Sequence, residues 1–163
     1  MAEIKIRFSV EKDESYLIDW LSEPGILKWF PMCDLREIKD AARIWISFAK
    51  EKAVLTATLD DIPVGIANLY LNPMKKLAHQ SLFAIIVDPK HRNKKIGTRL
   101  LIELEKLAKE RFKIEVMHLE VYEENPAISL YERFGYKHYG IQKRFIKEKD
   151  RYRGKIFMQK ELL

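Results

Sequence analysis

The residues with the clearest chemical potential lie in the segment DPKHRNKK, residues 88–95, which follows the apolar run SLFAIIV at residues 81–87. A helical pattern, IGTRLLIELEKL, begins directly after it at Ile96. The first main-chain N–H groups of a helix lack internal partners, and the helix dipole places partial positive charge there. A strand, a basic loop and a helix start in this order therefore predict an anion site, where main-chain donors converge on a diphosphate.

Side chains of the same segment favour a phosphate ligand. Arg92, Lys94 and Lys95 supply positive charge, and Thr98 adds a hydroxyl group. Gly97 lets the main chain approach a ligand closely, because a Cβ atom there would occupy ligand space. The segment matches neither the G-x-x-x-x-G-K-[ST] motif of P-loops nor the G-x-G-x-x-G motif of dinucleotide sites. A solvated basic turn before a core helix stays open as the alternative.

A second segment, NPAISLYERFGY at residues 125–136, has the signals of a short helix. Asn125 suits the N-cap, Pro126 the first helical turn and Gly135 the C-terminal stop. Tyr131 lies inside this helix, where it either packs in the core or presents its hydroxyl group to a site.

The elements that must position these segments follow from hydrophobic periodicity. Asp13 is expected to cap the first helix, and Asp34 with Glu37 has capping-box spacing for the second. The expected strands span residues 4–10, 53–59, 64–71, 81–87, 116–122, 137–146 and 154–162, and the expected helices span 13–22, 34–51, 96–112 and 125–135. This order predicts a mixed sheet flanked by helices, α/β in the broad sense and α+β in detail.

Composition restricts the class of protein. The chain has 163 residues, 47% hydrophobic and 33% charged, which is typical of one globular domain, here residues 1–163. No apolar run could span a bilayer and the first residues lack a secretory signal, so no membrane partner and a cytoplasmic location are expected. Cys33 is the only cysteine, which excludes an intrachain disulfide and a Cys-based zinc site, and we expect it to be a buried small residue or a bystander and not a nucleophile. No metal is expected, and the net charge of +6 favours an anionic partner.

Two motifs at the expected separation carry a family resemblance. V-D-P-x-x-R-x-x-K-x-G at residues 87–97, with the segment 125–136, resembles the GNAT N-acetyltransferases, which transfer an acetyl group from acetyl-CoA to an amine. The family's loop motif, Arg/Gln-x-x-Gly-x-Gly/Ala, is matched by Arg92 and Gly97, while Lys95 stands where the family usually has its first glycine. The family's later motif is matched by Ala127, Tyr131, Gly135 and Tyr136. The family's Asn register falls on Glu124, so Asn125 is read either as a cofactor contact or as a cap.

The resemblance implies a fold and a co-substrate. The fold would be the GNAT fold, α/β (α+β), with a central, mixed, mostly antiparallel, twisted sheet of six to seven strands, flanked by helices and splayed at strands 4 and 5. Acetyl-CoA would be the co-substrate, although other acyl groups stay open. The residues implied to bind it are Ile85, Ile86, Val87, Arg92, Asn93, Lys94, Lys95, Ile96, Gly97, Thr98, Asn125 and Tyr131.

The resemblance also implies catalytic roles. The main chain of residues 85–87 would pair with the pantetheine arm, and the N–H of Ile86 or Val87 would stabilise an oxyanion. Tyr131 would donate a proton to the leaving thiolate. Glu120 matches a base position of members that acetylate protein N-termini, and His118 or water remain as alternatives.

The acceptor implied is a primary amine of a small molecule or a peptide, and the protein would be a monomer or a homodimer. Trp29 and Phe30 are candidates for the wall of an aromatic acceptor pocket. Acidic residues available to attract a cationic amine are Asp34, Glu123, Glu124 and Asp150.

Two other functions stay open. One is a catalytically idle domain that binds acyl-CoA. The other is a basic nucleic-acid-binding module, suggested by charge and by the aromatic residues interleaved with Lys and Arg in residues 136–155. A closing β-hairpin with one solvated face accounts better for that pattern, so we do not expect nucleic acid as a partner.

Overall fold

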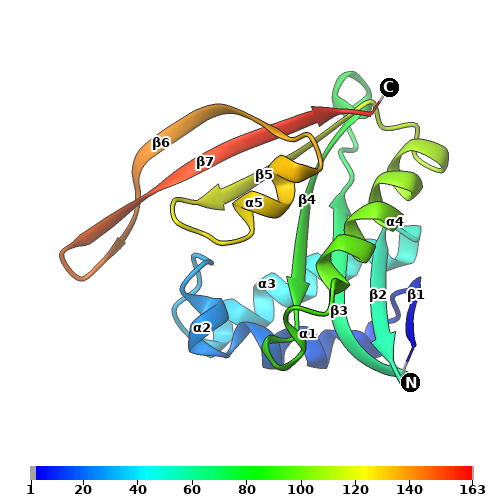
Figure 1. Cartoon of the computed structure of the whole chain (residues 1–163), viewed down its shortest axis with the longest axis horizontal. Helices are drawn as coiled ribbons and strands as arrows, with labels where there is room; N and C mark the ends of the chain where they lie inside the picture. The colour runs from blue at the N-terminus through cyan, green and yellow to red at the C-terminus, as the bar shows by residue number, and fades with distance from the viewer. Residues whose placement is uncertain (1–2, 163) are drawn as a thin grey trace.

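A single seven-stranded sheet, in the order β1-β2-β3-β4-β5-β7-β6, organises the computed structural model, which describes residues 3–162 (Figure 1). The strands are β1 (Ile4–Phe8), β2 (Val54–Leu59), β3 (Ile62–Tyr70), β4 (Gln80–Val87), β5 (Val116–Tyr122), β6 (Lys137–Glu148) and β7 (Arg151–Glu161). Neighbouring strands are antiparallel except β4 and β5, which are parallel. The predicted mixed, mostly antiparallel sheet is confirmed.

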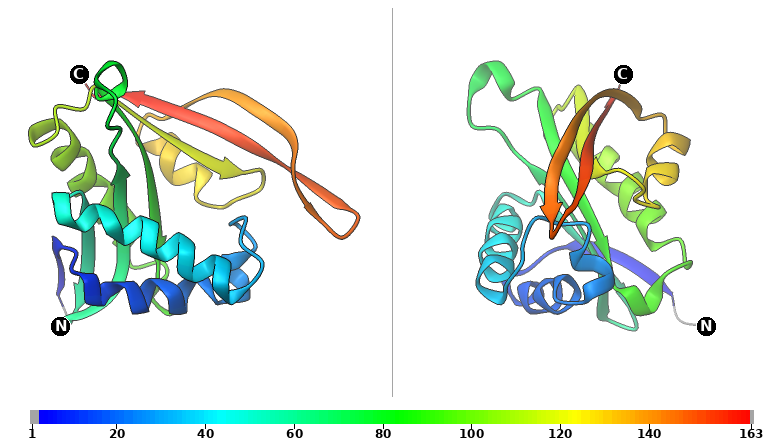
Figure 2. Two further views of the ribbon diagram at one scale, coloured as in Figure 1. Left: turned by 180° about the vertical axis from the view of Figure 1, so that it is seen from behind. Right: turned by 90° about the vertical axis from the view of Figure 1, so that its left-hand side faces the viewer.

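Helices cover both faces of this sheet (Figure 2). They are α1 (Glu14–Leu21), α2 (Pro24–Leu27), α3 (Leu35–Ser47), α4 (Ile96–Glu110) and α5 (Ile128–Arg133). One core lies between the sheet and α4 with α5, and a second lies between the sheet and α1 to α3. Among the described helices, none combines the length and the apolar character needed to cross a membrane.

The sheet opens between its two parallel strands. β4 pairs with β5 only where residues 80–82 face residues 116–118. Beyond that point β4 stays on β3 up to Val87, and β5 stays on β7 up to Tyr122. Because each strand follows a different neighbour, a gap opens between them, and the predicted splay at strands 4 and 5 is confirmed.

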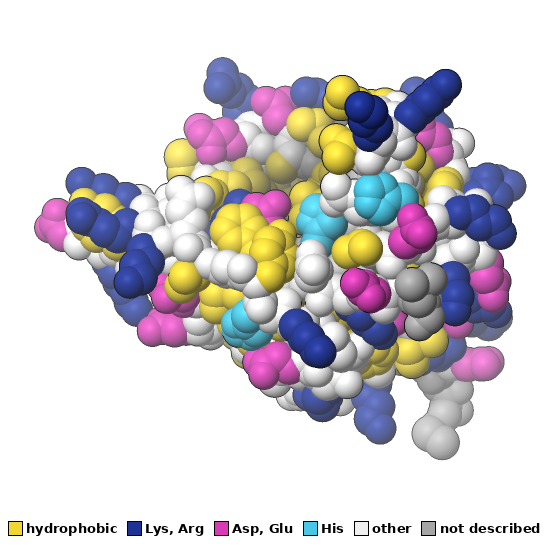
Figure 3. Space-filling model, turned by 90° about the horizontal axis from the view of Figure 1, so that it is seen from above, with side chains coloured by type: hydrophobic (Ala, Val, Ile, Leu, Met, Phe, Trp, Pro, Cys, Tyr) yellow, Lys and Arg dark blue, Asp and Glu magenta, His cyan; other side chains and the backbone are white. Residues whose placement is uncertain are grey.

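The closing strands form a long hairpin that projects past the body of the molecule (Figure 2). It is longer than the periodicity predicts, since pairing continues to Glu148 and Arg151 at its tip. Lys and Arg side chains gather on this projecting end when the molecule is seen from above (Figure 3). The pairing register shifts in two places, which lets the hairpin twist.

Two helix starts differ from their sequence pattern. Asp34 caps α3 as predicted, accepting a 2.8 Å hydrogen bond from Glu37 N–H. The Glu37 carboxylate, however, accepts from Cys33 N–H at 2.8 Å, one residue before the usual capping-box partner. Cys33 is exposed, so it is not a buried small residue, the first of its two expected roles. At the other helix, Asn125 Oδ1 accepts from Ala127 N–H at 2.9 Å and α5 begins only at Ile128, so Asn125 forms a turn just before the helix.

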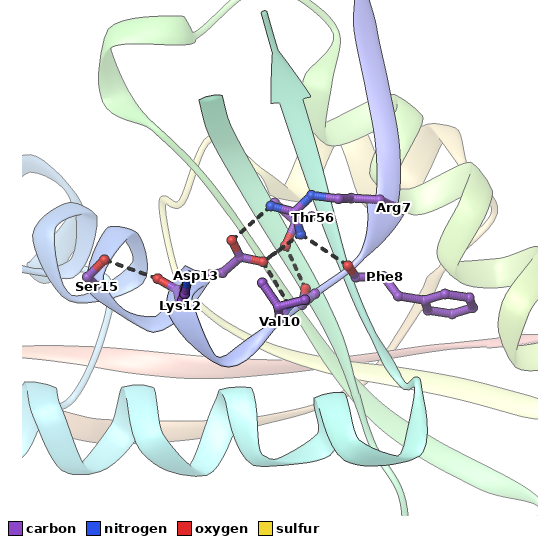
Figure 4. Close-up of polar contacts among 8 residues, drawn as sticks. Arg7, Phe8, Val10, Lys12, Asp13, Ser15 and Thr56 are labelled. Carbon is purple, nitrogen blue, oxygen red and sulfur yellow. Dashed lines mark hydrogen bonds and ion pairs between the residues drawn. The ribbon is translucent and has the colours of Figure 1, made fainter. Parts of the chain in front are cut away.

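Asp13 precedes α1 but does not cap it, contrary to the prediction. Its buried carboxylate accepts two hydrogen bonds from the Arg7 guanidinium, at 2.8 and 2.9 Å, and one from Val10 N–H at 3.0 Å (Figure 4). The Thr56 hydroxyl donates a further bond of 2.9 Å from β2. Asp13 therefore ties the start of the first helical layer to β1 and β2.

Candidate active site

A groove of about 640 Å³ lies beside the end of β4, between the loop that precedes α4 and the start of α5. It brings the two sequence motifs together, although about 30 residues separate them along the chain. The predicted cofactor residues that line it are Ile85, Val87, Arg92, Asn93, Lys95, Ile96, Gly97, Thr98, Asn125 and Tyr131. Ile86 and Lys94 do not line the groove.

The conformation of Lys95 explains the glycine usual at this position. Lys95 lies immediately before α4 with φ 60° and ψ 23°, in the left-handed region. Glycine adopts that conformation without a steric penalty, whereas a side chain costs roughly 1 kcal/mol. Asn93, two residues earlier, also has a left-handed φ of 62°. The loop therefore keeps the turn that glycine would favour, and the Lys95 side chain is exposed.

Gly97 is not required by the fold. A Cβ atom at Gly97 would lie 3.6 Å from Leu130 Cδ2 and 3.8 Å from Val87 Cγ2, which are ordinary contact distances. At Gly65, by contrast, a Cβ atom would lie 3.0 Å from side-chain atoms of both Ile96 and Leu100, so this glycine is needed for α4 to pack on β3. The open space at Gly97 belongs to the groove, and the residues around it fit the narrow approach of a phosphate chain.

The main chain of β4 has groups free to face the gap. Asp88 N–H donates to Val64 O at 2.8 Å, so residue 88 directs its main-chain groups toward β3. Alternate residues of an antiparallel pair point to the same side, so Ile86 also faces β3, where it is paired with Ile66. The expectation that Ile86 offers its main chain to the pantetheine arm therefore fails, whereas Ile85 and Val87 face the gap and keep that predicted role.

Tyr131 occupies the inner end of the groove and is also a core residue. Its ring packs edge-on against Phe83, at 5.9 Å between centroids, and against Tyr136, at 6.1 Å. The side chain lines both the groove and a small cavity of about 150 Å³ in the gap. Burial raises the pKa of Tyr131 to about 12, so its hydroxyl group keeps its proton at neutral and mildly alkaline pH.

A second pocket of about 370 Å³ lies on the opposite side of the gap and is called here the aromatic pocket. Its aromatic lining residues are Trp29, Phe30, Trp45, Tyr70, Phe83, Tyr122 and Phe145. The small cavity in the gap shares Trp29, Phe30 and Glu120 with this pocket, and Ile85 and Tyr131 with the groove. The gap is thus bordered by a basic groove on one side and by an apolar pocket on the other.

Glu120 lies where the aromatic pocket meets the gap. Its carboxylate forms an ion pair with the Lys155 ammonium, and Glu120 keeps 30% of its side chain exposed. Lys155 also lies 4.0 Å above the Phe145 ring. His118, two residues earlier on β5, is half-buried; burial lowers its pKa, and the nearby Glu120 charge opposes this change. His118 therefore has a neutral ring at physiological pH, but it does not line the pocket.

The other acidic residues considered for the pocket mouth are used elsewhere. Asp34 caps α3, the Glu123 carboxylate accepts from Gly154 N–H at 2.6 Å, and Glu124 pairs with Arg151 at 3.3 Å. Asp150 lies in the turn at the hairpin tip. Within residues 3–162, Glu120 is the acidic side chain that lines the aromatic pocket. Asp34, Glu123, Glu124 and Asp150 do not line the pocket.

Sequence reasoning missed several residues of the aromatic pocket. Tyr122 could have been found, because it lies two residues after Glu120 and so shares its strand face. Lys155 and Phe145 could not, because their positions depend on the register of β5, β7 and β6. The predicted aromatic wall of Trp29 and Phe30 does line the pocket.

A sheet that opens between two parallel strands, beside the start of a helix that lines a basic groove, is the arrangement expected for the GNAT fold. The sequence profile of the acetyltransferase (GNAT) family matches residues 14–136, and the chain belongs to this family. GNAT acetyltransferases use acetyl-CoA as co-substrate. A search of curated protein sequences finds no match.

Solved structures share the fold across nearly the whole chain. YncA from Salmonella typhimurium, solved with its cofactor acetyl-CoA, is 19% identical with a TM-score of 0.80, over 98% of this chain and 94% of that one. A GNAT-family acetyltransferase from Streptococcus pneumoniae is 22% identical with a TM-score of 0.78, over 98% and 99%. The ribosomal-protein-alanine N-acetyltransferase of Brucella melitensis is 26% identical with a TM-score of 0.77, over 96% and 99%.

Proposed function

We propose that the protein transfers an acetyl group from acetyl-CoA to a primary amine by direct attack in a ternary complex. The observation that carries this proposal is the gap between β4 and β5, with the basic groove on one side and the aromatic pocket on the other. Two substrates that enter from opposite sides would meet inside the gap. The enzyme would be one domain over residues 1–163.

The groove residues would hold the co-substrate. The loop at residues 92–98 would bind the diphosphate through its main-chain N–H groups and basic side chains. Ile85 and Val87 would pair their main-chain groups with the pantetheine arm, as a neighbouring strand would. The Val87 N–H is the donor best placed for the thioester oxygen, because a pre-aligned donor stabilises negative charge that develops there.

Two side chains would move the protons. An amine attacks only when neutral, so Glu120 would accept its proton, directly or through water, with His118 as the alternative base. Tyr131 would give its proton to the thiolate that leaves, since its raised pKa keeps the hydroxyl group protonated. Because Glu120 borders the pocket and Tyr131 borders the groove, base and acid lie on opposite sides of the gap.

Acetyl-CoA binding and free-thiol release test the proposal together. Acetyl-CoA at 100 times its Kd should stabilise the protein by about 2.7 kcal/mol, seen as a rise in Tm. A panel of amines should then release free thiol, and Tyr131→Phe should slow turnover about 100-fold. A rise in Tm without thiol release from any amine would instead identify an idle acyl-CoA-binding domain.

A further inference from the structure

The aromatic pocket carries information about the acceptor, on the assumption that the proposed acetyl transfer is correct. Its walls are supplied by the α2–α3 connection, α3, the end of β3, β4, β5 and the projecting hairpin. Apolar and aromatic side chains make up most of this lining, and the volume of about 370 Å³ is within the range of small-ligand pockets, about 300–1,000 Å³. A ligand here would bury hydrocarbon surface against rings that already pack on each other, such as Phe30 on Trp45 at 6.4 Å.

Charge in the pocket is limited to one pair. Glu120 and Lys155 are its charged lining residues, and they neutralise each other. A polyamine carries several positive charges and needs several carboxylates, while an amino sugar carries many hydroxyl groups that need polar partners. The pocket offers neither arrangement. It suits a ligand with one amine, which can reach Glu120, and a large apolar body.

Two buried side chains of the pocket carry polar atoms that lack a partner, which is a second observation in favour of an occupant. Trp45 Nε1 and Tyr122 Oη have no hydrogen-bond partner within the described residues 3–162, although both side chains are at least nine-tenths buried and line the pocket. An unpaired buried donor costs free energy, so nearly all such groups in proteins find a partner. The Phe145 and Tyr122 ring centroids lie 6.0 Å apart, so a ligand ring that packs beside Phe145 would bring a nearby oxygen atom within reach of Tyr122.

We infer that the acceptor is an arylalkyl primary amine that bears an oxygen acceptor near the amine, as in an aromatic amino-acid amide or a peptide with an aromatic first residue. The ring occupies the aromatic pocket, the amine lies at Glu120, and the oxygen accepts from Tyr122 or Trp45. Attack of the neutral amine on the thioester carbon forms the amide and breaks the C–S bond. The amine proton leaves to Glu120 and the thiolate gains one from Tyr131.

The experiment compares acceptors that differ only in the ring. Thiol release is measured with L-phenylalaninamide and L-alaninamide, with the peptides Phe-Ala-Ala and Ala-Ala-Ala, and with spermidine and glucosamine. Burial of the ring should make kcat/KM about 10- to 100-fold higher for L-phenylalaninamide than for L-alaninamide, and likewise for Phe-Ala-Ala than for Ala-Ala-Ala. A higher kcat/KM for Phe-Ala-Ala than for L-phenylalaninamide would identify the natural acceptor as a peptide. A higher kcat/KM for the amide would identify it as a small-molecule amine. Equal values within both pairs, or faster turnover of spermidine or glucosamine, overturn the inference.

A matched pair of variants localises the effect. Phe145 is half-buried and lines the pocket, whereas Tyr139 lies on the same strand, is 55% exposed and does not line it. Phe145→Ala should reduce the preference for phenylalaninamide over alaninamide about tenfold, and Tyr139→Ala should not. Both variants should keep the rise in Tm with acetyl-CoA. An unchanged preference in Phe145→Ala contradicts the assignment of the pocket.

Direct binding separates this inference from the proposed function. Trp29 and Trp45 line the pocket, so an aromatic amine should change tryptophan fluorescence even without acetyl-CoA. If no amine is acetylated, transfer fails as the function, but saturable binding of phenylalaninamide and not alaninamide still supports the aromatic pocket. The absence of such a difference in binding overturns it.

Discussion

Two pairs of acidic and basic residues show how the same chemistry serves the fold in one region and a site in another. Asp13 and Arg7 lie where β1, β2 and the start of α1 meet, and Asp13 is only 3% exposed, with partners from the guanidinium, the Val10 N–H and the Thr56 hydroxyl (Figure 4). Glu120 and Lys155 lie at the edge of two cavities, and Glu120 keeps 30% exposure. A carboxylate whose two oxygens are both hydrogen-bonded to the protein holds elements together, whereas a carboxylate that borders a cavity can receive a ligand.

Removal of the buried carboxylate should give the largest loss of stability. Asp13→Ala removes the carboxylate that Arg7, the Val10 N–H and the Thr56 hydroxyl share, leaves Thr56 only its contact with the Ser9 hydroxyl, and should lower the free energy of unfolding by about 3 kcal/mol. Denaturant unfolding measures this value. Asp40→Ala, which removes the exposed Asp40–Arg43 pair, is the matched control and should cost less than about 1 kcal/mol. Similar losses in both variants would contradict the structural role given to Asp13.

The same carboxylate predicts a dependence on acid. Burial favours a higher pKa for Asp13, but hydrogen bonds from Arg7, Val10 and Thr56 outweigh it and lower the pKa below its usual value. A lowered folded-state pKa contributes stability that is present above the unfolded value of about 3.9 and lost as pH falls through the folded value. Wild type should therefore lose its advantage over Asp13→Ala below about pH 4.

The pair at the cavity should behave in the opposite way. Glu120→Gln removes the charge that accepts the amine proton, so kcat/KM for the amine should fall about 100-fold. Its stability should change by less than about 1 kcal/mol, because the carboxylate is partly solvated and the glutamine oxygen can still accept a hydrogen bond from Lys155. The rise in Tm with acetyl-CoA should persist. A loss of stability comparable to that of Asp13→Ala, with turnover intact, would place Glu120 among the structural residues.

The two pairs also mark the limit of prediction from sequence. Periodicity and turn residues predicted the strands, the two motifs of the groove and the helices other than the short α2, because these signals are local along the chain. Asp13 looked like a helix cap because an aspartate before a helix gives the same local signal wherever its side chain points. Its partners Arg7 and Thr56, like the partner Lys155 of Glu120, depend on which strands meet and in which register.

Gly97, which lines the groove, and Gly65, which lies on β3 against α4, offer the same contrast without charge. Gly97→Ala should leave stability unchanged or raise it by up to about 1 kcal/mol, because alanine favours the helix and meets no close atom. It should raise the KM for acetyl-CoA about tenfold, since the added methyl group enters ligand space. Gly65→Ala, which forces Ile96 and Leu100 to move, should lower stability instead. An unchanged KM for acetyl-CoA in Gly97→Ala would contradict a role of the basic loop in binding the co-substrate and would favour the alternative of a solvated turn.

Substitutions of Lys95 should give the smallest effects on stability, and they test the left-handed conformation of one residue in the basic loop. Lys95→Gly removes a left-handed side-chain penalty but adds freedom to the unfolded chain, so the net gain in stability should be below about 1 kcal/mol. Lys95→Ala keeps the penalty and removes only the charge. If the charge contributes to diphosphate binding, both variants should raise the KM for acetyl-CoA to the same extent, and only Lys95→Gly should raise Tm. A lower Tm for Lys95→Gly than for Lys95→Ala would mean that the loop does not hold residue 95 in the left-handed conformation.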